Sequence, residues 1–115
     1  SVICSHHDLD ATPSADKIIR LFNQMKRKHS DIVKLVFTPK DGNDILSILK
    51  AAEEIGKAEV PFTLFGMGQE GKITRLVSPN FGGSLVYCSL EKNPDATLGQ
   101  IDLGRAKKYF EYPRV

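Results

Sequence analysis

One segment constrains the fold of this chain more than any other, the apolar run Ile32-Val33-Lys34-Leu35-Val36-Phe37. A strand with one face in water alternates apolar and polar residues, whereas a strand covered on both faces has a nearly continuous apolar sequence. Pro39 follows closely and ends the run, because proline cannot donate a hydrogen bond to a sheet. The run therefore predicts a buried strand over residues 31–38 in a parallel sheet.

Strands and helices alternate along the rest of the chain. We predict strands at about 2–6, 31–38, 61–66 and 84–89, helices at about 15–28 and 43–55, a loop between the third and fourth strands, and a last helix after Gly99. This order is typical of an α/β fold in which right-handed crossovers build a parallel sheet.

Local signals set the expected helix ends and faces. Ser14 or Thr12 is expected to cap the first helix, because a side-chain oxygen there accepts a free backbone N–H. Gly56 is expected to end the second helix as its C-terminal cap. The last helix is expected to bury Leu103, Ala106 and either Tyr109 or Phe110.

Four parallel strands do not make a finished domain. Helices on one face would leave the other face bare and both sheet edges without a partner strand. An open sheet covered on both faces is one alternative, but three helices must then do all the covering. A closed barrel fills its interior with side chains. We therefore favour half of an eight-stranded barrel, a single partial domain over residues 1–115. Because the chain opens inside a strand, we expect that it was cut from something longer and that a complementary half or a homo-oligomer completes it.

Composition excludes several functions. The 115 residues carry 16 Lys+Arg against 14 Asp+Glu, a formal net charge of +2, which gives no basic footprint for nucleic acid or an anionic membrane. No apolar run approaches the about 18 residues needed to cross a bilayer. The 2 cysteines, Cys4 and Cys88, do not form a disulfide framework, so we expect reduced thiols in the cytoplasm.

Lys34 is the residue with the clearest chemical potential. It lies in the middle of the most hydrophobic strand, where lysine is rarely buried without a reason. Burial disfavours the charged ammonium, and a neutral amine is a nucleophile towards carbonyl carbons. The alternative is that the side chain reaches water at the rim of the sheet.

His7 follows the first strand directly, at the end of the sheet where catalytic residues gather in a barrel. Histidine is the natural acid and base near neutral pH, although an isolated turn histidine is often only a surface residue. The cluster of His6, His7, Asp8 and Asp10 does not predict a metal site. Adjacent strand residues point to opposite faces, and no zinc-type spacing is present.

The segment Gly66-Met67-Gly68-Gln69-Glu70-Gly71 follows the third strand and permits a tight turn. Its likeness to a dinucleotide-binding fingerprint is superficial, because that motif needs a strand-to-helix context and a downstream acid. Arg75 follows and can hold a carboxylate through two parallel hydrogen bonds. We expect Gly82-Gly83 and Leu98-Gly99-Gln100 to be loops at the ligand-binding end, the second of them a candidate lid.

These residues are most informative together. A strand lysine, a rim histidine on the preceding strand and an arginine after the next strand would all point into one cavity. Such a set is typical of an imine-forming lyase or aldolase that acts on a small anionic ketone.

The same residues resemble the type I 3-dehydroquinate dehydratase family over nearly the whole chain. Similar to family motifs are Ser5-His6-His7-Asp8-Leu9 with Thr12-Pro13, Asp31-Ile32-Val33-Lys34, Gly66-Met67-Gly68 with Gly71 and Thr74-Arg75-Leu76, Phe81-Gly82-Gly83-Ser84-Leu85, and Leu98-Gly99-Gln100-Ile101. The sequence departs from the family pattern at Leu9, Ala96 and Leu98. It also resembles only strands five to eight, the C-terminal half of a (β/α)8 TIM barrel.

The resemblance implies a role for each matching residue. His7 would be the acid/base and Lys34 the imine-forming nucleophile, while Arg75 and Gln100 would contact substrate. We also expect Met67 and Thr97 to line the substrate site. The implied reaction is dehydration of 3-dehydroquinate to 3-dehydroshikimate without a metal or organic cofactor.

Other functions remain open at this stage. The first alternative is a catalytically incomplete half-barrel that acts only as a folding or assembly unit. Another Schiff-base lyase or aldolase is a second alternative. Nucleotide binding by the glycines is the weakest.

Overall fold

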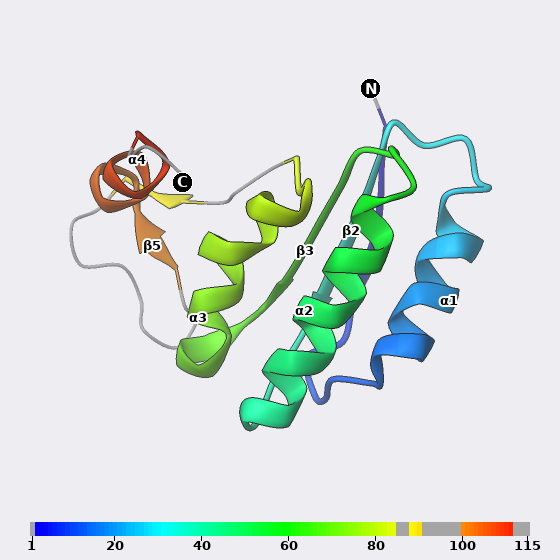
Figure 1. Cartoon of the computed structure of the whole chain (residues 1–115), viewed down its shortest axis with the longest axis horizontal. Helices are drawn as coiled ribbons and strands as arrows, with labels where there is room; N and C mark the ends of the chain where they lie inside the picture. The colour runs from blue at the N-terminus through cyan, green and yellow to red at the C-terminus, as the bar shows by residue number, and fades with distance from the viewer. Residues whose placement is uncertain (1, 85–87, 91–99, 112–115) are drawn as a thin grey trace.

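The computed structural model describes residues 2–84, 88–90 and 100–111. Strands and helices alternate through most of this length (Figure 1). The elements are β1 (Ile3–His7), α1 (Ala15–Met25), β2 (Ile32–Phe37), α2 (Gly42–Gly56), β3 (Phe62–Gly66), α3 (Gly68–Val77), the 3-10 helix η1 (Ser78–Phe81), β4 (Cys88–Ser89), β5 (Ile101–Asp102) and α4 (Leu103–Glu111).

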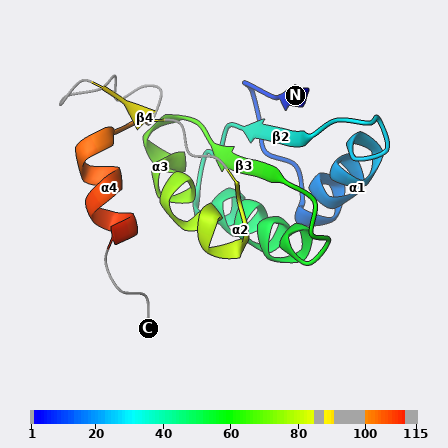
Figure 2. The ribbon, with the colours of Figure 1, turned by 90° about the horizontal axis from the view of Figure 1, so that it is seen from above.

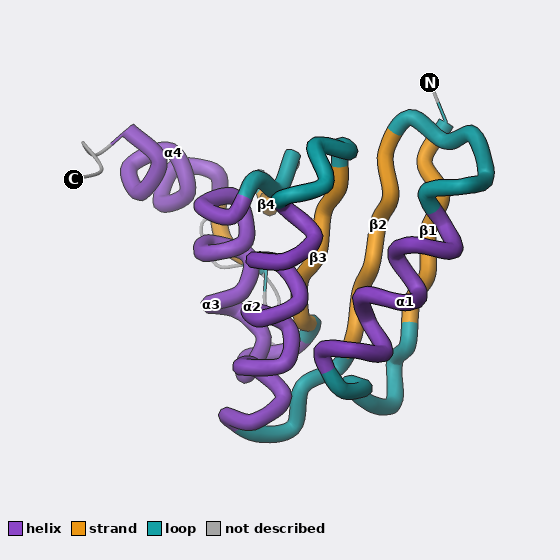
Figure 3. The backbone as a smooth tube through the Cα atoms, turned by 45° about the vertical axis from the view of Figure 1, so that its right-hand side comes forward, coloured by secondary structure: helices purple, strands orange, loops and turns teal. Residues whose placement is uncertain are grey.

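The first three strands form one parallel sheet in the order β1-β2-β3. They run side by side in Figure 3, where they are orange, with the helices drawn in purple. The predicted parallel α/β fold is therefore confirmed. A second, two-stranded parallel sheet pairs β4 with β5. The short strand β5 was not predicted.

The hydrophobic core lies on one side of the three-stranded sheet. Figure 2 shows α1, α2 and α3 on the same side of these strands. The apolar residues of β2 and β3 that point to this side are fully buried against α1 and α2. The core comprises Ile18, Phe22, Met25, Val33, Leu35, Phe37, Ile48, Ala51, Ala52, Ile55, Phe62 and Leu64.

Helix caps explain where α1 and α2 begin. Ser14 Oγ accepts the backbone N–H of Lys17 at 3.3 Å, so the predicted cap of α1 is confirmed. Asp41 caps α2 in the same way by accepting the N–H of Asp44 at 3.0 Å. The predicted cap at Gly56 is wrong, because Gly56 is still helical and Lys57 is the cap. A Cβ on Gly56 would overlap the carbonyl oxygen of Phe81, so close packing explains this glycine.

The predicted loop after the third strand is also wrong, since α3 and η1 fill this segment. The glycines there bring α3 close to β3. A Cβ on Gly71 would lie 2.3 Å from the carbonyl carbon and oxygen of Gly66. Thr74 Oγ1 accepts the Gly66 N–H at 2.7 Å and donates to the Gly71 carbonyl, which joins the helix to the strand. A strand-to-helix turn is thus present, but its glycines serve packing.

The predicted fourth strand agrees only in part with the structure. Ser84 donates its N–H to the Phe62 carbonyl at 2.6 Å, so the chain enters beside β3. Residues 85–87 lie outside the described residues, and β4 spans Cys88–Ser89.

In α4, Ala106 is buried and Phe110 is half-buried, as predicted. Of the two aromatic alternatives, Tyr109 is 38% exposed, and the predicted burial of Leu103 is wrong, because it is 37% exposed. None of the described helices combines the length and apolar character that crossing a bilayer requires.

Candidate active site

The register of the sheet defines a second face, opposite the core. His7 pairs with Val36, and Val36 pairs with Phe65; one step earlier, Ser5 pairs with Lys34 and Lys34 with Thr63. Residues paired across parallel strands point to the same face, and residues two apart along a strand share it. We call the face that carries Ser5, His7, Lys34, Val36, Thr63 and Phe65 the open face.

Lys34 lies on the open face and not in the apolar core. It is half-buried, which lies between the two alternatives of full burial and a side chain that reaches water at the rim. Val33 and Leu35, its neighbours in the strand, point to the core side and are fully buried. The apolar run therefore reflects the core on one side and Val36 on the other, the side on which Lys34 is partly exposed.

His7 lies close to Lys34 on the neighbouring strand. It pairs with Val36, two residues beyond Lys34, and ordinary strand geometry sets the two Cα atoms about 8 Å apart. Partial desolvation lowers the pKa of His7 from 6.5, and the positive charge of Lys34 and then His6 lower it further. A lowered pKa keeps the imidazole neutral, and so able to accept a proton, at lower pH.

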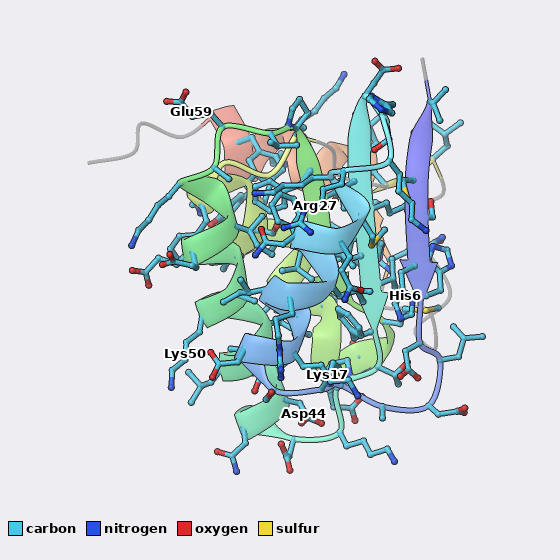
Figure 4. All side chains as sticks on the ribbon, turned by 90° about the vertical axis from the view of Figure 1, so that its right-hand side faces the viewer. His6, Lys17, Arg27, Asp44, Lys50 and Glu59 are labelled. Atoms are coloured by element: carbon cyan, nitrogen blue, oxygen red, sulfur yellow. The ribbon has the colours of Figure 1, made fainter. Side chains whose placement is uncertain are left out.

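His6 points away from His7, to the side covered by α1 (Figure 4). Its ring lies 5.9 Å from that of Phe37, a core residue. It lines a cavity of about 480 Å³ with Asp8, Lys17 and others. Among the described residues, no three His, Cys, Asp or Glu side chains gather in a geometry that could hold a metal ion. The two histidines therefore serve different faces of the sheet.

Arg75 reaches the open face from α3. Its side chain is only 6% exposed, and its guanidinium carbon lies 4.2 Å from the centre of the Phe65 ring. Desolvation lowers the pKa of Arg75, although this group still carries its charge at neutral pH. Burial raises the pKa of the Cys88 thiol. The charge of Arg75 acts to lower this pKa and the charge of Asp102 acts to raise it, so Cys88 lies near both groups.

Of the remaining predicted site residues, the structure describes Met67 and Gln100 but not Thr97. Met67 is half-buried, directly precedes α3 and donates its N–H to the Phe37 carbonyl at 2.8 Å, beside the ends of β2 and β3. Gln100 is half-buried directly before β5. Thr97, Ala96 and Leu98 lie outside the described residues.

Gly82-Gly83 lies at the opposite end of the sheet from the expected one. Gly82, with φ of 99°, and Ser84 line a cavity with Gly56 and Phe62, at the start of β3. A loop that leads into a parallel strand enters at the amino end, whereas ligands bind at the carboxyl ends. The prediction that these glycines flank the ligand is therefore wrong. They form a turn, since the N–H of Gly83 binds the Ser78 carbonyl at 3.2 Å.

Sequence reasoning missed several residues around the predicted ones. Thr63 is 1% exposed and stands directly across from Lys34, while Phe65 lies under Arg75. The two-residue period of β3 could have placed both on the open face. Cys88 and Asp102 carried no comparable signal, because their proximity to Arg75 depends on the β4–β5 pairing.

Together the open face holds an amine, an imidazole and a guanidinium. An amine can form an imine with a carbonyl compound, an imidazole can move protons, and a guanidinium can bind an anion. The geometry favours chemistry on a small anionic carbonyl compound.

Comparison with curated proteins gives consistent relatives. The chain is similar to a 3-dehydroquinate dehydratase of Methanosarcina acetivorans, 34% identical over 111 residues, which are 96% of this chain and 46% of that protein. It is also similar to a 3-dehydroquinate dehydratase of Enterococcus faecalis, 30% identical over 112 residues and covering 44% of that protein. The chain thus spans about half the length of the curated relatives it matches.

Solved structures agree in fold. The type I 3-dehydroquinate dehydratase of Clostridium difficile, solved with covalently modified comenic acid, superposes with a TM-score of 0.86 at 27% identity. It is matched over 93% of this chain and 42% of that chain. The Enterococcus faecalis enzyme superposes with a TM-score of 0.80 at 30% identity, over 42% of its chain. These neighbours are TIM barrels, so the fold is about half of such a barrel. The model of the type I 3-dehydroquinase family matches residues 1–114, and the chain therefore belongs to this family.

Proposed function

We propose that this chain forms the catalytic half of a 3-dehydroquinate dehydratase, in which Lys34 is the nucleophile and His7 the acid/base. One observation carries the proposal: the two groups share the open face on neighbouring strands, and the charge of Lys34 lowers the pKa of His7. Membership of the type I family and the covalently modified ligand in the Clostridium difficile enzyme support it.

In the proposed reaction, Lys34 first loses its ammonium proton to water, and the neutral amine then attacks the ketone carbon of 3-dehydroquinate. The ketone oxygen leaves as water, with His7 moving the protons, and an imine forms. The imine withdraws electrons from the neighbouring carbon, so His7 can remove a proton there. His7 then returns that proton to the departing hydroxyl, which leaves as a second water. Hydrolysis of the imine releases 3-dehydroshikimate and regenerates Lys34.

Arg75 is proposed to bind the substrate carboxylate. The Phe65 ring lies against its guanidinium and limits the directions in which the cation can turn. A buried arginine has lost much of its hydration, so a carboxylate partner gains more from the interaction than it would at an exposed surface. Gln100, Met67 and Thr97 are proposed to complete the contacts to substrate.

The pocket is proposed to need a second polypeptide segment. Within the described residues, β1 pairs only with β2, so one edge of the sheet has no strand beside it. The coverage of about 46% of a relative fits an N-terminal half-barrel or an oligomer as the complement. We further propose a cytoplasmic location, which the free thiols of Cys4 and Cys88 support.

Borohydride reduction in the presence of 3-dehydroquinate tests the proposal. Intact mass is measured for the chain alone and for the chain combined with an N-terminal half from a related dehydratase. An adduct on Lys34 with the complement, absent in Lys34→Met, is expected. Lys40→Met is the matched control, because Lys40 is exposed between β2 and α2.

The same experiment distinguishes the main alternative. A half-barrel that serves only for folding or assembly would associate with its complement but form no adduct and show no turnover. That result would overturn the catalytic proposal. The observation that favours a role in assembly alone is the edge of β1, which has no neighbouring strand among the described residues.

A further inference from the structure

The position of His7 at the end of β1 raises a physical problem. His7 is exposed and is the last residue of a five-residue strand. Within the described part of the chain, β1 is hydrogen-bonded on one side only. The terminal residues of an edge strand open most readily, because few contacts hold them. If the His7 imidazole is to stay beside Lys34, contacts outside β1 must hold the backbone of His7 in place.

Three hydrogen bonds supply that support directly after His7. Asp8 donates its backbone N–H to the Val36 carbonyl at 2.9 Å. Thr38 Oγ1 donates to the Asp8 carbonyl at 3.0 Å, and this contact is partly buried. Thr38 also donates its N–H to the Ala11 carbonyl at 3.2 Å. The chain that leaves β1 is thus joined at three points to the end of β2.

The Asp8 side chain closes the same loop from within. Its Oδ1 accepts the N–H groups of Asp10 at 2.9 Å and Ala11 at 3.1 Å, which is an Asx turn. These two N–H groups hold the pKa of Asp8 below its usual value, so the carboxylate stays ionised near neutral pH. We call the three bonds to β2 and this turn the Asp8–Thr38 clasp.

We propose that Asp8 and Thr38 are positioning residues that hold His7 at a fixed separation from Lys34. Thr38 directly follows β2, the strand that carries Lys34, and it is tied to the residue that directly follows His7. The clasp therefore links the two reacting groups through one backbone step on the His7 side and four on the Lys34 side. This inference rests on the proposed roles of His7 and Lys34.

The clasp matters because both groups act on neighbouring atoms of one substrate. The proton-transfer step depends on a separation near hydrogen-bonding distance, and an error of about 1 Å can cost about 100-fold in rate. Loss of a hydrogen bond at the clasp changes the position of His7 and leaves the carboxylate-binding Arg75 in place. The expected effect is on kcat and not on KM.

Thr38→Val tests the clasp, because it keeps the shape of threonine and removes the hydroxyl donor. In the chain combined with its N-terminal complement, kcat is expected to fall by about 10–100-fold with KM within about twofold. Thr38→Ser keeps the hydroxyl and is expected to restore most of kcat. Ser47→Ala is the matched control, since it removes a side-chain bond to the Asn43 carbonyl on α2, away from the site.

NMR titration of the His7 imidazole measures its pKa, which depends on how His7 is placed and would not change if Thr38 only stabilised the fold. Thr38→Val is expected to shift the pKa of His7, and Thr38→Ser to leave it unchanged. Should Thr38→Val fail to fold, Asp8→Ala and Asp8→Asn replace it: asparagine keeps the Oδ1 acceptor of the turn and alanine does not.

The outcomes separate the clasp from the proposed function. An unchanged kcat and an unchanged His7 titration in Thr38→Val or Asp8→Ala would overturn the clasp. If Thr38→Val shifts the His7 titration but the assembled wild-type protein shows no turnover, the result would support the clasp and reject the dehydratase proposal.

Discussion

Gly71→Ala tests how closely α3 must approach β3. The added Cβ would lie 2.3 Å from the Gly66 carbonyl carbon and oxygen, whereas ordinary contact begins near 3.4 Å. The obstructing atoms are backbone, so the helix itself must move by roughly 1 Å. Overpacking of this kind costs about 1–3 kcal/mol. The same movement stretches the bond from the Gly66 N–H to Thr74 Oγ1, which adds about 1–3 kcal/mol if the buried N–H loses its partner.

Helix propensity acts in the opposite direction. Alanine favours a helix interior over glycine by about 1 kcal/mol. The net expectation is a loss of about 3 kcal/mol in the free energy of unfolding. For a chain of 115 residues that loss lowers Tm by about 12 °C.

Urea unfolding followed by circular dichroism measures the change. Gly42→Ala is the matched control, because Gly42 is the first residue of α2 and a Cβ there has nothing within 4 Å. We expect it to be neutral or stabilising by up to about 1 kcal/mol. A Gly71→Ala protein as stable as Gly42→Ala would refute the argument that backbone contact between α3 and β3 requires glycine.

Three further substitutions test the site. Lys34→Met removes the charge that lowers the pKa of His7, so NMR titration should find that pKa moved up toward 6.5; an unmoved curve would show that the two groups do not interact. His7→Ala in the complemented protein is expected to leave some imine trapping but reduce kcat by about 10²–10⁴-fold, and near-normal turnover would place the base elsewhere. Arg75→Lys keeps a charge but loses the planar pair of donors; steady-state kinetics should show KM raised by about tenfold or more with a smaller change in kcat, and an unchanged KM would remove Arg75 from substrate binding.

Local signals predicted the first half of the chain well. The strand at residues 31–38, the Ser14 cap and the helical spacing of α1 and α2 all depend on neighbours within a few residues. Even there, α1 ends at Met25 and not at residue 28, because the chain turns at residues 26–27 and His29 adopts a left-handed φ of 53°.

Prediction failed where a residue's role depends on a distant partner. Three glycines within six residues have the composition of a loop, yet Gly66 and Gly71 allow a helix to pack on a strand. Strand β5 has only two residues and exists through its pairing with β4. The direction of the chain at Gly82-Gly83 likewise follows from the parallel topology and not from the glycines themselves.

The parallel α/β class, the family and the identity of the chemical groups could all be inferred from the amino-acid sequence. Each of these follows from residue types and short-range spacing. The relative positions of these groups depend on how the chain folds: Lys34 lies half-buried on the open face, His7 lies diagonally beside it, and Arg75 reaches the same face over Phe65. Strand register is a relation between segments about thirty residues apart, so a face shared by β1, β2 and α3 exists only once the sheet has formed.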